Sequence, residues 1–154
     1  MKQRDDLLTE VEHFARSKPA ATVLMQRISD RLHDELVRYN WVGFYLIDKN
    51  DPGWLVLGPY AGTETPHVHI PLNQGLCGAA ASLRKTIVVN DVASDPRYLM
   101  GSEHTKSEII VPLVARNQAV GELDINSYFK DTWNQKEQQF VEQCARLAAS
   151  FLGK

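Results

Sequence analysis

The residues in this sequence best suited to chemistry are acidic side chains at alternating positions in its C-terminal half. Glu122, Asp124 and Asn126 alternate with apolar residues, and Glu108 lies in the apolar run that precedes them. In a β-strand, alternate side chains point to the same face. Polar groups on a central strand are costly unless that face lines a wet cavity or contacts a partner. We therefore expect Glu108 and Asp124 to contact a ligand, with carboxylates at the surface or at a helix cap as the alternative.

An aromatic pair lies in an earlier apolar run. Trp41 and Tyr45 are four positions apart, so in a strand they share one face. Such a pair forms either a pocket wall suited to cations and methyl groups, or ordinary aromatic core. Both interpretations stay open on the sequence alone.

The sulfur and imidazole groups suggest little further chemistry. Two cysteines are too few for a disulfide framework, and Cys144 lies on the apolar stripe of a predicted helix. We expect Cys77, in a small-residue helix, to be a buried and inert thiol. His67 and His69 could bind a metal at their i, i+2 spacing, but two solvated histidines on an edge strand are commoner. We predict no metal and no cofactor.

The elements that must position these residues follow from hydrophobic periodicity. We predict helices over 5–15, 23–36, 75–83 and 134–152, and strands over 40–48, 54–60, 67–72, 86–89, 107–115 and 119–126. Within these, we expect Val23 on an apolar helix stripe, a turn at Asn117-Gln118, a helical turn near Tyr98 and a helix cap at Thr132.

Strands joined mainly by hairpins imply an antiparallel sheet. We predict an α+β fold in which a six-stranded antiparallel sheet carries the terminal helices on one face. A short helix and the long loop over 90–106 would cover the other face, with a pocket beneath them. At 154 residues, without a linker or a repeat, the chain fits a single domain over 1–154.

Charge and hydropathy exclude some classes of binding partner. The net charge of −2 gives no basic field for nucleic acid. No apolar run approaches the roughly 20 residues that span a bilayer, and the first residues lack a secretory signal. We therefore expect no nucleic-acid or membrane partner and a cytoplasmic location.

The predicted elements carry two sets of motifs. The first set is Gly75-x-x-Gly78, VASDPRY at 92–98 and SEIIVPL at 107–113, and with this order of elements the chain resembles a GAF domain over almost its whole length. The second set is NWVGFYL at 40–46, LGPY at 57–60, GLCG at 75–78, SEI at 107–109 and LDI at 123–125, which together are similar to the signature of the free methionine-(R)-sulfoxide reductases within that superfamily.

The resemblance implies roles for the residues singled out above. Trp41 and Tyr45 match an aromatic substrate cage. Glu108, Asp124 and position 126 match carboxylates that hold the amino group of the substrate and assist proton transfer. Position 126 is Asn126 here, so one negative charge of the family pattern is absent.

The reductase pattern also includes three cysteines, of which this sequence keeps Cys77 alone. The nucleophile position falls on Gly101, and the principal resolving position falls on His67. Reduction of this kind needs a thiolate that attacks sulfur and a second thiol that releases it as a disulfide. A shared fold does not carry shared chemistry, so we expect no thiol redox catalysis.

Three functions remain in view. The first is a stand-alone sensory GAF domain that holds a small, polar, amine-bearing ligand, with the loop around Gly101 as a lid and Asn126 beside the two acids. The second is a reductase with altered cysteine usage that depends on Cys77. The third is an interaction module with a vestigial pocket, since GAF domains often pair through terminal helices. Pairing through 3–16 and 134–152 would make the protein a homodimer.

Overall fold

The structure is a computed structural model that describes residues 1–100 and 102–153. Its helices are α1 (Lys2–Ala15), α2 (Ala21–Glu35), α3 (Gly75–Leu83) and α4 (Gln135–Ala149), with a 3₁₀ turn at Val92–Ser94. Its strands are β1 (Trp41–Ile47), β2 (Trp54–Ala61), β3 (His69–Pro71), β4 (Ile87–Val89), β5 (Ser107–Ala115) and β6 (Gln118–Ser127). Within these described ranges, no helix has both the length and the apolar character that a membrane span requires.

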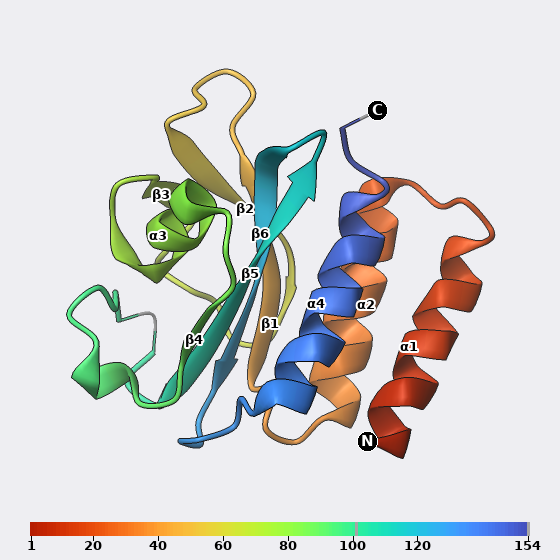
Figure 1. Cartoon of the computed structure of the whole chain (residues 1–154), viewed down its shortest axis with the longest axis horizontal. Coiled ribbons are helices and arrows are strands. Elements are labelled where there is room, and N and C mark those ends of the chain that lie inside the picture. Colours follow the sequence, from red (N-terminus) through yellow and green to blue (C-terminus); the bar gives the residue numbers. More distant parts are fainter. Residues whose placement is uncertain (101, 154) are drawn as a thin grey trace.

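A six-stranded sheet organises these elements in the order β3-β2-β1-β6-β5-β4, and every strand pair is antiparallel. Figure 1 shows α1, α2 and α4 on one face of the sheet and α3 on the other, beside the segment that follows β4. This arrangement confirms the predicted α+β fold. It also leaves β5 and β6 between the helical core on one face and α3 on the other.

β5 and β6 form the central hairpin of the sheet. Its turn lies one residue earlier than predicted. It consists of Arg116 and Asn117, whose φ angles are 53° and 62°, and Ala115 pairs with Gln118. Two-residue turns with positive φ match the twist of hairpin strands. The predicted turn at Asn117-Gln118 was wrong because the strand pairing already includes Gln118.

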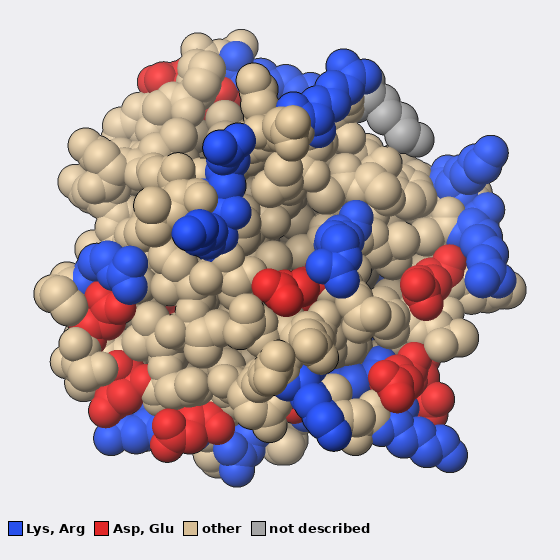
Figure 2. All heavy atoms as spheres, viewed as in Figure 1, with Lys and Arg blue, Asp and Glu red and all other residues tan. Residues whose placement is uncertain are grey.

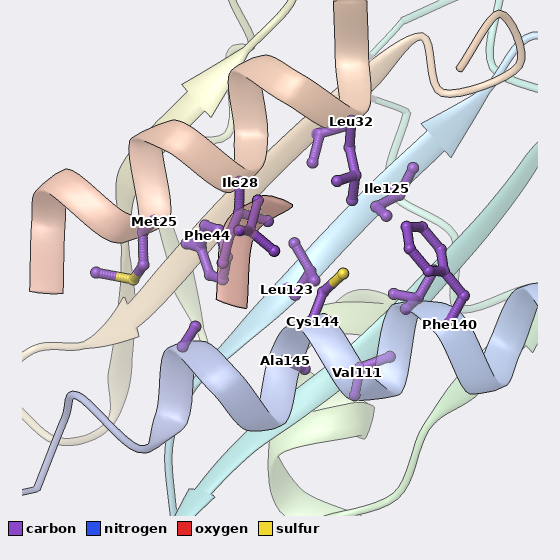
Figure 3. Packing of buried hydrophobic residues seen from close by; sticks show 14 of the residues in the cluster. Met25, Ile28, Leu32, Phe44, Val111, Leu123, Ile125, Phe140, Cys144 and Ala145 are labelled. Carbon is purple, nitrogen blue, oxygen red and sulfur yellow. The ribbon is translucent and has the colours of Figure 1, made fainter. Parts of the chain in front are cut away.

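The main hydrophobic core lies on the face covered by α2 and α4. Leu32, Leu123, Phe140 and Cys144 are each at most 3% exposed, and Figure 3 shows them meeting between the two helices and the sheet. The predicted packing role of Cys144 is therefore confirmed. Val23 is 50% exposed, because consecutive helical side chains point about 100° apart and the following residue faces the core.

Two local predictions are also corrected. Asn134 caps α4, since its side-chain oxygen accepts the backbone N–H of Glu137 at 2.9 Å. Thr132, the predicted cap, lies in the preceding loop and hydrogen-bonds there. The helical turn expected near Tyr98 forms earlier, at Val92–Ser94.

Candidate functional site

A cavity of about 50 Å³ lies between the sheet and α3. One buried water needs about 10–15 Å³, so the interior beneath α3 is hollow rather than filled by side chains. Seven residues were predicted to contact a ligand or, for the thiol, to act in a reductase, and six of them line the cavity, namely Trp41, Tyr45, Cys77, Glu108, Asp124 and Asn126. The seventh, Gly101, lies outside the described residues. That these residues contact a ligand stays a prediction.

Strand register brings the acidic side chains together. Glu108 of β5 pairs with Asn126 of β6, and Asp124 lies two positions earlier on β6. The two acids are 6% and 4% exposed. Asn126 donates its side-chain N–H to Asp124 Oδ1 at 3.3 Å, and the thiol of Cys77 donates to Asp124 Oδ2 at 3.4 Å. Asp124 is therefore held from two sides.

Burial raises the pKa of Glu108 well above its usual range, and the nearby negative charge of Asp124 raises it further. Burial also raises the pKa of Asp124, while hydrogen bonds from Glu108 and Cys77 oppose part of that shift. Two neighbouring carboxyl groups in one buried site cannot both ionise freely. Without a cation the pair therefore keeps a proton, and a cation nearby would favour the charged forms.

The charge inside the cavity differs from that of the exterior. Figure 2 shows Lys and Arg interspersed with Asp and Glu over the face in view. Glu64, Glu108 and Asp124 line the cavity, whereas His67 is the one basic residue among its described lining residues. The interior therefore favours a positively charged occupant.

The aromatic pair forms a wall of the cavity and also fixes the segment after β2. The Trp41 ring lies 6.2 Å from the Tyr45 ring and stacks on Tyr60 at 5.6 Å. Trp41 donates its indole N–H to the carbonyl of Thr63 at 3.0 Å, and the Tyr45 hydroxyl donates to the carbonyl of His67 at 2.7 Å. Tyr60 ends the LGPY motif, but its stacking on Trp41 was not predicted, and its partner across the sheet is Gly43 of β1, between the two aromatics.

The two histidines have different neighbours. His67 lies before β3, and its Nε2 is 2.8 Å from the carbonyl oxygen of Met100. His69 lies on β3 and stacks on Trp54, with ring centroids 4.2 Å apart. The strand predicted over 67–72 is shorter than expected, since β3 begins at His69 and leaves His67 outside it. His67 instead joins the segment after β2 to the segment that follows β4.

A family model for the GAF domain matches residues 21–152. The chain belongs to the GAF family. The domain is 33% identical over 112 residues to the free methionine-R-sulfoxide reductase of Saccharomyces cerevisiae, and the match covers 72% of this chain. It spans only 62% of that protein's length. The domain is also 35% identical over 123 residues to the Escherichia coli enzyme of the same name, covering 77% of this chain and 72% of the enzyme.

A solved structure has the same architecture. The free methionine-R-sulfoxide reductase from Neisseria meningitidis, in complex with its substrate, superposes with a TM-score of 0.89 at 26% identity. The superposition covers 96% of this GAF domain and 87% of that chain. The predicted resemblance to the family and to these reductases is confirmed.

The two thiols of the GAF domain lie on opposite faces of the sheet. Cys77 belongs to the cluster beneath α3 and Cys144 to the helical core, and both are free and buried. Burial raises the pKa of Cys77 well above its usual range, and the nearby carboxylates Glu122 and Asp124 raise it further. The expectation of a buried Cys77 is confirmed, and a protonated thiol is a poor nucleophile.

Glu122 is the member of this site that the sequence analysis left without a role. Its side chain is fully buried, and neither carboxylate oxygen has a hydrogen-bond partner of ordinary geometry among the described residues. Burial raises its pKa well above the usual range, and an interaction with the Cys77 thiol opposes this shift. Its alternation with Asp124 was the available signal, because it placed both acids on the cavity side of β6.

Proposed function

We propose that this GAF domain is a sensory or small-molecule-binding domain that holds a small, polar, amine-bearing ligand without thiol redox catalysis. The observation that carries the proposal is the coupled pair Glu108 and Asp124, buried at a cavity whose described lining has no Lys or Arg. Buried carboxyl groups are stabilised in their charged forms by a cation. An ammonium group would supply that cation, and Trp41 and Tyr45 would contact its adjacent carbon atoms.

The arrangement of sulfur supports the part of the proposal that excludes thiol chemistry. Sulfoxide reduction by thiols needs a thiolate and then a second thiol within bonding distance of it. Cys77 is the one thiol at the cavity, and Cys144 lies beyond the sheet in another core. No partner thiol therefore lies near Cys77, and its raised pKa keeps it protonated.

Calorimetric titration tests the binding proposal. The names of the relatives make free methionine-R-sulfoxide the first probe, followed by a panel of free amino acids and small amines. Glu108→Gln should weaken binding about 10- to 150-fold, as expected for a lost hydrogen bond to a charged group. Glu103→Gln is the matched control, because its side chain is 82% exposed. Wild-type affinity in the double variant Glu108→Gln/Asp124→Asn would contradict the proposal.

A second candidate is a reductase that depends on Cys77. It is favoured by the names of the yeast and E. coli relatives and by the contact of Cys77 with Asp124 at the cavity. An NADPH-coupled thioredoxin assay on free methionine-R-sulfoxide separates the two candidates. Turnover that disappears in Cys77→Ala and persists in Cys144→Ala would establish the reductase and exclude the first proposal.

A further inference from the structure

Three possible metal ligands meet at the floor of the cavity. Cys77 of α3, Glu108 of β5 and Asp124 of β6 each offer one ligand atom, and these atoms lie within 4.8 Å of one another. All three side chains are buried. They come from three different elements, so the packing of α3 against the central hairpin brings them together.

A fourth acidic group, Glu122, lies beside this cluster. Glu122 is fully buried and interacts with the Cys77 thiol, but neither of its carboxylate oxygens has a hydrogen-bond partner of ordinary geometry in the described part of the chain. None of the ion pairs that the described residues form includes Glu108, Glu122 or Asp124. Buried acids are ordinarily paired with a base or bound to a metal. Three acids and a thiol, with His67 as the one basic residue in the described lining of the cavity, therefore form a site that a cation would complete.

We propose that Cys77, Glu108 and Asp124 bind a divalent, thiophilic metal ion, with Zn²⁺ the best match and with Glu122 beside the site rather than among the ligands. One sulfur and two carboxylate oxygens are donors that Zn²⁺ accepts with its fourth position left open, whereas Mg²⁺ and Ca²⁺ prefer oxygen alone. Zinc–ligand distances of about 2.0–2.3 Å place tetrahedral ligand atoms about 3.3–3.8 Å apart. The sulfur of Cys77 and Oδ2 of Asp124 are already 3.4 Å apart.

Metal binding replaces protons with the ion. The thiol of Cys77 and the carboxyl group that holds the shared proton would release their protons on binding. The positive charge of the ion would also stabilise the charged form of the nearby Glu122. No electron is transferred in this step, so it needs neither an oxidant nor a reductant.

The metal site goes beyond the proposed amine site and does not depend on it. The two occupants share Glu108 and Asp124, so a bound metal ion and a bound ammonium group exclude each other. A titration with the metal alone therefore tests this inference even if no amine binds. Competition by free methionine-R-sulfoxide would then test the amine proposal separately.

The experiment uses the full chain, freed of metal with a chelator and then titrated with Co²⁺ and with Zn²⁺. Co²⁺ bound to a thiolate produces a charge-transfer absorption band, which reports the sulfur ligand directly. We expect one equivalent to bind with this band, and Zn²⁺ to displace it. Cys77→Ser should abolish the band, and Cys144→Ser, which changes the other buried thiol, should keep it. Glu122→Gln should weaken Zn²⁺ binding at least about tenfold.

Three results would overturn the inference. The first is no saturable Co²⁺ band in the wild-type protein. The second is a band that persists in Cys77→Ser, and the third is unchanged Zn²⁺ affinity in Glu122→Gln. If Cys77→Ser does not fold, the nearly isosteric Glu122→Gln decides the question by calorimetry, with the circular dichroism of the variant as the check on folding.

Discussion

Glu122 gives the sharpest prediction about stability, because its carboxyl group is fully buried and neither oxygen has a hydrogen-bond partner among the described residues. Burial raises its pKa in the folded state well above the usual range. In the unfolded chain the same group titrates near its reference value of about 4.3. Above that pH the folded state holds a proton that the unfolded state has lost. The free energy of unfolding must therefore fall as pH rises above this value, until the pH reaches the folded-state pKa.

The size of the effect follows from this difference of one proton. Each pH unit in which the folded Glu122 is protonated and the unfolded one is ionised lowers the free energy of unfolding by about 1.36 kcal/mol. This loss accumulates with each pH unit until the pH reaches the folded-state pKa of Glu122. Glu122→Gln removes the part of the pH dependence of the free energy of unfolding that comes from Glu122. Glu108 and Asp124 keep their own contributions.

Urea denaturation of metal-free protein, followed by circular dichroism at several pH values, checks this prediction. The advantage of Glu122→Gln over the wild type should be small near about pH 5.5 and should grow steadily toward about pH 7.5. Glu12→Gln makes the same chemical change at an exposed position, and its difference from the wild type should stay flat. A difference for Glu122→Gln that is independent of pH, or that shrinks as pH rises, would refute the reasoning.

Three further substitutions probe how the fold supports the site. Leu123→Ala should lower the free energy of unfolding by about 2–5 kcal/mol in urea, because Leu123 is fully buried in the helical core; a loss below 1 kcal/mol would contradict that packing. Gly121→Ala should lower the free energy of unfolding by about 1–3 kcal/mol or more, because the added Cβ would clash with the Tyr45 carbonyl oxygen. Gly53→Ala is its control, because the added Cβ there would make only an ordinary contact, 3.6 Å from Asp51 Oδ1. Equal stability of the two variants would contradict the close approach of β6 to β1 at Gly121. Tyr45→Phe removes the hydrogen bond to the His67 carbonyl, so it should lower the free energy of unfolding by about 0.5–1.5 kcal/mol and speed hydrogen exchange over residues 62–67. Unchanged exchange would show that this bond does not fix the segment.

The sequence predicted the architecture because its signals are local. Alternation between positions 119 and 126 assigned Asp124 and Asn126 to one face of a strand, and the apolar run before it assigned Glu108 to a covered strand. Short connections between strands implied antiparallel pairing. These patterns gave the α+β class and most of the residues that line the cavity.

The details that the sequence missed depend on packing between distant elements. Alternation gives the face on which Glu122 lies, but its depth depends on where α3 packs. The stacking of Tyr60 on Trp41 depends on the pairing of β1 with β2. The cap at Asn134 depends on the loop before α4. The predicted homodimer stays a prediction that light scattering would test.

The central claim is that the cavity recognises a positively charged amine. Calorimetry with free methionine-R-sulfoxide and with its N-acetyl derivative tests it most directly, because acetylation removes the ammonium group and leaves the sulfoxide unchanged. We expect saturable binding of the free amino acid without turnover. The affinity for the acetylated form should be at least about tenfold lower, as expected for a lost hydrogen bond to a charged group. Equal affinity for the two molecules, or no binding of either, would contradict it.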